Sequence, residues 1–227
     1  MTESGLFISF EGGEGAGKST QIRRLAAALT AKGLDVVVTR EPGGSAGAEA
    51  VRHVLLNGAA EAYGTRMEAL LFAAARSDHV EQVIRPALKR GAVVLCDRFM
   101  DSSRVYQGVT GNLAADFIEA LQRIAVNGVV PHRTIILDIP AEVGLERARS
   151  RGAANQSAPD RYEKERLETH EKRRDGFLDI AIREPERCRV VNAGRPEDQI
   201  ASEILKLVEV LLKPRAGRRL KVADSAR

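Results

Sequence analysis

The chain has 227 residues, a formal net charge of +4, and a composition that is 44% hydrophobic and 29% charged. This size suits one globular domain with a full core, and we expect no membrane association, because no apolar run approaches the roughly 18 residues of a spanning helix and no signal-peptide pattern opens the chain. Two distant cysteines, Cys96 and Cys188, exclude a disulfide framework and indicate buried free thiols in the reducing cytoplasm.

The first predicted strand, Leu6–Phe10, leads into the complete motif G-x-x-x-x-G-K-S at residues 12–19. A helical pattern of apolar residues follows, so the motif has its strand–loop–helix context. Glycines turn backbone N–H groups onto phosphate oxygens, and the helix adds its positive end. A turn that merely joins strand to helix is far less favoured. We therefore predict an ATP site with Lys18 on the β- and γ-phosphates and Ser19 on Mg²⁺, formed by Gly12, Gly13, Glu14, Gly15, Ala16, Gly17, Lys18, Ser19 and Thr20.

Strands and helices alternate along the rest of the chain. Further short β-branched runs predict strands at 36–39, 92–96, 134–138 and 189–191. Apolar residues at helical spacing predict helices around 67–74, 80–87, 117–124 and 200–211. This alternation predicts an α/β fold with a five-stranded parallel sheet and helices on both faces.

Ligands of such a sheet bind beyond the carboxyl ends of its strands, so the residues after each strand are candidates. Arg40 follows the second strand as a cation for a phosphate, with Pro42 shaping the turn after it. Asp97 and Arg98 follow the third strand, where an aspartate serves as an outer magnesium partner and an arginine can hold a second phosphate. Polar side chains come next at Ser102, Ser103, Tyr106 and Gln107.

Phe72 and Arg76 are four residues apart on a predicted helix and share a face. A ring beside a guanidinium can stack on a planar base and bind its edge. From spacing alone, a core phenylalanine with an arginine that extends to solvent is favoured over that role.

Residues 151–176 are rich in charged side chains and poor in apolar ones. We expect this segment to bury little and to be mobile, either as a lid over the nucleotide site or as a solvated helix. The chain ends in a segment with six basic residues and one acidic residue among its last fifteen, so the rest of the chain is slightly acidic. We interpret residues 213–227 as a basic, disordered tail, with nucleic-acid binding as the less favoured alternative.

Several segments together resemble one family, in order and spacing, over residues 5–212. They are Phe10-Glu11-Gly12, Gly17-Lys18-Ser19, Thr39 to Gly44, Leu71 to Arg76, Asp97-Arg98, Ser102, Tyr106-Gln107-Gly108 and Leu137-Asp138. This set resembles the thymidylate kinases. The resemblance implies a P-loop nucleoside-monophosphate-kinase fold in residues 1–212, a homodimer, and Mg²⁺-dependent transfer of the γ-phosphoryl group of ATP to dTMP, giving dTDP for dTTP synthesis.

The resemblance also implies a role for each matched residue. Phe72 would stack on thymine and Arg76 would bind its carbonyl edge, while Arg40 and Arg98 would hold the phosphate of dTMP. The remaining members of the implied substrate site are Glu14 and Tyr106 near the sugar, Ser103 and Gln107 beside the base, and Pro42 and Ser102.

One departure concerns the catalytic arginine. Some members of the family carry an arginine in the P-loop, where this chain has Gly15. The chain therefore resembles the subclass that takes this arginine from a lid, here residues 147–162. Arg147 and Arg151 share a helical face, while Arg149 points elsewhere, and Arg161 is a further candidate. The catalytic set is thus Lys18, Arg98 and one of these four arginines.

Two other functions compete with this interpretation. Another nucleoside-monophosphate or deoxynucleoside kinase would differ in its acceptor, and a non-catalytic nucleotide sensor would have kept the fold without the chemistry. A GTPase is disfavoured because the sequence has no N-K-x-D motif for guanine. The retained Lys18, Ser19, Arg40, Asp97 and Arg98 favour an active kinase.

Overall fold

The structure, a computed structural model, describes residues 5–56, 58, 60–154 and 162–212. The predicted tail (213–227) and part of the predicted lid (155–161), including Arg161, lie outside the described residues.

A five-stranded parallel sheet organises the molecule, as the alternation of strand and helix patterns predicts, and its strand order is β2-β3-β1-β4-β5. The strands are β1 (Leu6–Glu11), β2 (Val36–Arg40), β3 (Val93–Asp97), β4 (Arg133–Asp138) and β5 (Cys188–Asn192). The strand β1 lies at the centre and is buried throughout. Because the chain passes to one side of β1 and then to the other, a crevice opens at the carboxyl ends of the central strands.

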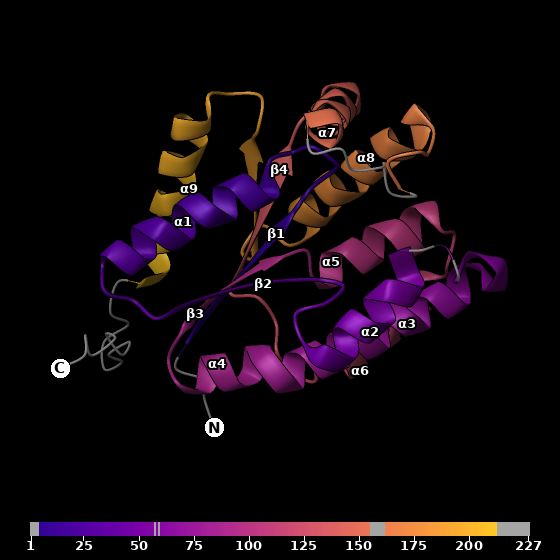
Figure 1. Cartoon of the computed structure of the whole chain (residues 1–227), viewed down its shortest axis with the longest axis horizontal. Coiled ribbons are helices and arrows are strands. Elements are labelled where there is room, and N and C mark those ends of the chain that lie inside the picture. The colour runs from indigo at the N-terminus through magenta and orange to yellow at the C-terminus, as the bar shows by residue number, and fades with distance from the viewer. Residues whose placement is uncertain (1–4, 57, 59, 155–161, 213–227) are drawn as a thin grey trace.

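Helices cover both faces of this sheet (Figure 1). The α-helices are α1 (Lys18–Ala31), α2 (Ala46–Leu56), α3 (Gly64–His79), α4 (Arg85–Lys89), α5 (Met100–Ser103), α6 (Ala115–Val126), α7 (Ala141–Ala154), α8 (Leu167–Arg183) and α9 (Glu197–Leu212). A 3₁₀ turn, η1 (Glu61–Tyr63), and two π-helical segments, η2 (Val80–Ile84) and η3 (Arg104–Thr110), complete the described elements.

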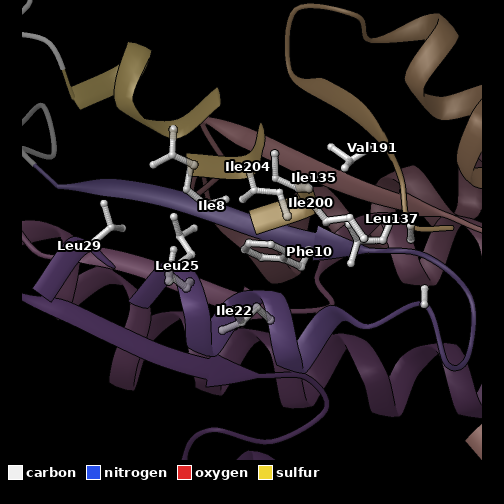
Figure 2. Packing of buried hydrophobic residues seen from close by; sticks show 14 of the residues in the cluster. Ile8, Phe10, Ile22, Leu25, Leu29, Ile135, Leu137, Val191, Ile200 and Ile204 are labelled. Atoms are coloured by element: carbon white, nitrogen blue, oxygen red, sulfur yellow. The ribbon is translucent and has the colours of Figure 1, made fainter. Parts of the chain in front are cut away.

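The core has two layers because alternate residues of a strand point to opposite faces. On one face, Ile8 and Phe10 of β1 pack with Ile22 of α1 and Ile204 of α9 (Figure 2). On the other face, Phe7 meets Phe99 edge to face, with 4.9 Å between the ring centroids. The free thiols of Cys96 and Cys188 are both buried, as the sequence predicts.

The predicted helices at 67–74 and 80–87 form one continuous helical run, because α3, η2 and α4 follow one another without a break. The π-helical turn η2 lies just before Pro86, near the start of α4. Proline lacks an N–H donor and crowds the preceding turn, and a wider turn relieves that crowding without ending the helix.

Candidate active site

The P-loop joins the buried end of β1 to α1, and its glycines make the turn possible. Gly12, Gly15 and Gly17 have φ angles of 130°, 66° and 92°, which side-chain-bearing residues rarely adopt. The Lys18 ammonium folds back over the loop and donates to the carbonyl oxygens of Gly12 and Gly13, at 3.0 and 2.9 Å. Burial, and then the nearby Arg98 guanidinium, lowers the pKa of Lys18.

The two predicted magnesium ligands lie side by side. The Ser19 hydroxyl donates to the Asp97 carboxylate at 2.7 Å, although the residues are 78 positions apart. The described residues contain no cluster of three or more His, Cys, Asp or Glu side chains that could hold a metal. Two oxygen donors beside a phosphate-binding loop fit Mg²⁺, which takes few protein ligands and completes its shell with water and phosphate oxygens.

One cavity of about 260 Å³ collects every predicted substrate residue. Its lining includes Glu14, Arg40, Pro42, Phe72, Arg76, Arg98, Ser102, Ser103, Tyr106 and Gln107. Ser19 and Asp97 line it as well, so the cavity borders the nucleotide loop. These side chains come from the P-loop, the ends of β2 and β3, the helices α3 and α5 and the segment η3.

Glu14 ties the P-loop to the segment after β3. It accepts hydrogen bonds from Arg98 and from the Tyr106 hydroxyl, each at 2.7 Å. Burial alone would raise the pKa of Glu14, but the charges of Arg98 and Lys18 outweigh burial and lower it to about 2. Arg98 itself has a φ of 69°, a strained conformation for a non-glycine residue and one typical of functional sites.

Arg76 is buried, with 1% of its surface exposed, and four groups accept its hydrogen bonds. The acceptors are Glu41 at 2.7 Å, Ser103 at 3.0 Å, the Phe99 carbonyl at 3.0 Å, and Gln122. The expectation from spacing alone, an arginine that extends to solvent, is therefore wrong. Spacing does not reveal that the Glu41 carboxylate, just after β2, neutralises the charge of Arg76.

Two other predicted residues are held by acidic partners. Arg40 is more than half exposed and pairs with Glu49 at 3.0 Å. The Gln107 amide donates to Glu68 at 2.6 Å, and the Tyr162 hydroxyl also donates to Glu68, at 3.1 Å.

The predicted lid arginines on α7 do not line the cavity. Arg147 donates to the Ala193 carbonyl at 3.1 Å, and the exposed Arg151 lies 3.9 Å from Glu163. Arg149 is exposed on the same helix. The helix α8, which follows the predicted lid, is more buried than its many charged residues suggest. Its His170 and Arg173 are only 5% and 3% exposed.

Arg173 explains why the expectation that residues 151–176 bury little is wrong for α8. Its guanidinium lies 4.2 Å from the centroid of the Tyr106 ring and forms an ion pair with Glu165. An arginine can be buried when it stacks on an aromatic ring and pairs with a carboxylate, whereas composition alone predicts that it faces solvent.

Sequence reasoning missed two carboxylates at the site. Glu41 lines the cavity beside Arg76. Glu11, at the end of β1, accepts hydrogen bonds from the Phe99 and Ser102 N–H groups and from the Ser102 hydroxyl. Burial, and then the Asp101 charge, raises the pKa of Glu11 to about 7. Both residues lie at the ends of strands, within motifs whose neighbouring residues were predicted to bind ligands. That position is the sequence signal that could have identified them.

A parallel sheet of this order, a complete P-loop and an arginine-lined acceptor cavity next to it define a P-loop nucleoside-monophosphate kinase. Residues 10–204 match the family model described as thymidylate kinase. The thymidylate kinase of Caulobacter vibrioides is 57% identical over 208 residues, covering 92% of this chain and 97% of that protein. The thymidylate kinase of Bradyrhizobium sp. is 52% identical over 197 residues, covering 87% and 86%.

A solved structure agrees with these relatives. The crystal structure of thymidylate kinase from Ehrlichia chaffeensis has a TM-score of 0.70 and 32% identity, and the match covers 90% of this chain and 99% of that one. The chain belongs to the thymidylate kinase family, and its reaction is the ATP-dependent phosphorylation of dTMP to dTDP. Within the described ranges, no helix is long and apolar enough to cross a membrane.

Proposed function

We propose that the 260 Å³ cavity is the dTMP site and that different residues of its lining bind the phosphate, the sugar and the base. Arg40 and Arg98 hold the phosphate, Phe72 stacks on thymine, and Arg76 binds a carbonyl of the base. Ser103 and Gln107 lie beside the base, Glu14 and Tyr106 near the sugar, and Pro42 and Ser102 complete the wall. One observation carries this proposal: residues selected from the sequence in four separate stretches of the chain, at 14, 40–42, 72–76 and 98–107, line a single cavity that also reaches Ser19 of the P-loop.

ATP binds with its phosphates on residues 12–20, and Ser19 together with Asp97, acting through water, would hold Mg²⁺. Bound there, Mg²⁺ supplies positive charge that offsets the charge of the transferred phosphoryl group. Lys18 supports this arrangement because its ammonium rests on two loop carbonyls and can turn from them to phosphate oxygens. The loop thus keeps a cation in place before the nucleotide arrives.

The reaction needs alignment and charge compensation more than proton transfer. The attacking oxygen of dTMP is already anionic, so no strong general base is required. The difficulty is bringing two anions together, and Lys18, Arg40 and Arg98 reduce that repulsion. Residues 147–162 would close as a lid and exclude water, which otherwise competes as an acceptor. Arg151, Arg147, Arg149 or Arg161 would then supply the last positive charge.

We treat residues 1–212 as one kinase domain and propose that the chain forms a cytoplasmic homodimer. The buried free thiols fit a reducing compartment. The apolar stripe of α3 faces solvent, with Met67 and Leu70 each 44% exposed, and Tyr63 just before it is 72% exposed. Exposed apolar side chains close together on one helix are typical of a protein interface.

A coupled assay of ADP formation tests the proposal, with dTMP, dUMP, dCMP and thymidine as acceptors. We expect dTMP to be the preferred acceptor and thymidine to be inactive, since Arg40 and Arg98 would have no phosphate to hold. Lys18→Ala should abolish turnover while its thermal unfolding stays cooperative. ATP and dTMP binding without turnover in the unaltered protein would instead support the nucleotide sensor.

A further inference from the structure

Glu41 lies at the centre of a buried polar chain behind the base-binding wall. It follows β2 directly and is 6% exposed. One carboxylate oxygen accepts from the Arg76 Nε at 2.7 Å, and the other lies 3.0 Å from the His79 Nδ1. The second ring nitrogen of His79 lies 2.6 Å from the Thr39 hydroxyl. Both oxygens of Glu41 are therefore committed to protein groups.

The hydrogen bonds of Arg76 leave little for a ligand. An arginine has five N–H donors. Nε donates to Glu41, Nη1 donates to Ser103 and Gln122, and Nη2 donates to the Phe99 carbonyl. Among the bonds of the described residues, one Nη2 donor remains for the cavity that Arg76 lines. The guanidinium plane is thus fixed by contacts to α6, to Glu41 just after β2 and to the segment after β3.

We propose that Glu41 is a positioning residue that makes the acceptor site reject pyrimidines carrying an amino group at position 4. This inference rests on the proposed binding of the base by Arg76. Thymine and uracil have a carbonyl at position 4, which accepts a hydrogen bond, whereas cytosine has an amino group, which donates. A guanidinium only donates, so it opposes cytosine as long as it cannot turn away. Glu41 removes that freedom by holding Nε.

The variant Glu41→Gln tests this role. The glutamine amide is neutral and has one oxygen in place of two, so the Arg76 guanidinium loses its counter-charge and is held less firmly. We expect kcat/KM for dTMP to fall about 10- to 100-fold, the loss typical of a hydrogen bond involving a buried charged group. We expect kcat/KM for dCMP to stay level or rise, so the ratio of dTMP to dCMP falls at least tenfold. The ratio of dTMP to dUMP should not change, because both bases share the carbonyl.

Glu49→Gln is the matched control. Glu49 pairs with Arg40, one of the two arginines proposed to hold the phosphate. The same chemical change should therefore raise KM for dTMP and dCMP together and leave their ratio unaltered. A second variant, Glu41→Asp, keeps the charge but withdraws the carboxylate from Nε by one methylene, and it should lower the ratio in the same direction. It keeps the inference testable if Glu41→Gln fails to fold.

The outcomes separate the inference from the proposed function. An unchanged dTMP to dCMP ratio in a folded Glu41→Gln or Glu41→Asp variant overturns the role of Glu41, because a merely structural defect lowers kcat/KM for both substrates in proportion. An unaltered protein that uses dCMP as well as dTMP contradicts the proposed contact between Arg76 and the base. Absence of any dTMP-dependent turnover contradicts the proposed site as a whole.

Discussion

Two glutamates near the P-loop have opposite electrostatic surroundings. Glu14 lies against Arg98 and Lys18, whose charges outweigh burial and lower its pKa to about 2. Glu11 lies deeper, where burial and the neighbouring Asp101 raise its pKa to about 7. Asp101 takes the arginine partners in that region, since Arg104 and Arg187 both pair with it. Three positions along the chain thus separate a permanent anion from a group that titrates near neutrality.

We predict that Glu11 makes folding less favourable as the pH rises from about 4.5 to about 7. Its pKa is higher in the folded state than the ordinary value of 4.5, so the unfolded chain loses the proton first and gains stability over this range. In urea unfolding, the free energy of unfolding of the parent minus that of Glu11→Gln should decrease across this window and then level off.

Glu14→Gln provides the control of opposite sign. Its lowered pKa means that the stabilisation by the Glu14 carboxylate is present above pH 4.5 and is lost as the pH falls towards 2. A pH-independent difference between the parent and Glu11→Gln would contradict the raised pKa of Glu11.

The residues that line the proposed site were predictable, whereas their supporting partners were not. Arg40, Asp97 and Arg98 follow strands, and a parallel sheet brings the carboxyl ends of its strands to one edge. Glu41 meets Arg76 only because α3 packs with one particular rotation, and Arg173 reaches Tyr106 only because of how α8 crosses η3. Periodicity predicts which face of a helix is buried, but it does not predict which residues of other elements pack against that face.

At the level of elements, the P-loop and α7 touch through two glycines. A Cβ atom at Gly15 would lie 1.8 Å from the Gly144 carbonyl oxygen, and one at Gly144 would lie 2.4 Å from the Glu14 carbonyl oxygen. An arginine therefore has no room at position 15 unless α7 moves. The missing P-loop arginine and the close approach of α7 are therefore linked, because the helix that carries Arg147 and Arg151 occupies the space that an arginine at position 15 would need.

Gly144→Ala should destabilise the protein by about 1–3 kcal/mol, the usual cost of overpacking, even though alanine favours a helix by about 1 kcal/mol. Gly176→Ala in α8 is the matched control, because its nearest neighbours are valine methyl groups at 3.3 Å that can move. Thermal unfolding of both variants measures the difference. Equal melting temperatures would show that α7 yields easily at this contact.

Arg151→Ala should lower kcat much more than it raises the KM for dTMP. The reason is that Arg151 lies on α7, away from the acceptor cavity, and would act only when the lid closes. Steady-state kinetics with dTMP as the varied substrate measure both constants. An unchanged kcat would transfer the role to Arg147, Arg149 or Arg161.

For the whole molecule, the sequence predicted the sheet and missed the continuity of its helices. Strands such as Val36–Arg40 are short β-branched runs between turn signals, and their alternation with helices leaves few topologies. The π-helical turns η2 and η3 have no pattern of their own, because they depend on local crowding such as that before Pro86. The stripe at Met67 and Leu70 has helical spacing but faces solvent, so periodicity alone did not distinguish the core from the surface.

Leu70→Glu should convert the proposed homodimer to a monomer, because a charge in an apolar interface must be desolvated without a partner. Analytical ultracentrifugation measures the mass in solution. Ile182→Glu on α8, where the isoleucine is 75% exposed, is the control and should keep the parent mass. A parent protein that sediments as a monomer would refute the homodimer.

The buried hydrogen bonds of Arg76 also bear on how its base preference can change. Replacing Arg76 by a residue suited to another base would orphan the buried acceptors on Glu41, Gln122 and Phe99 at once. No single substitution repairs all of them, so each one-step path to a new base passes through a destabilised protein. If Arg76 binds the base as proposed, a change of base preference therefore requires several substitutions in α3, α6 and the turn after β2 together.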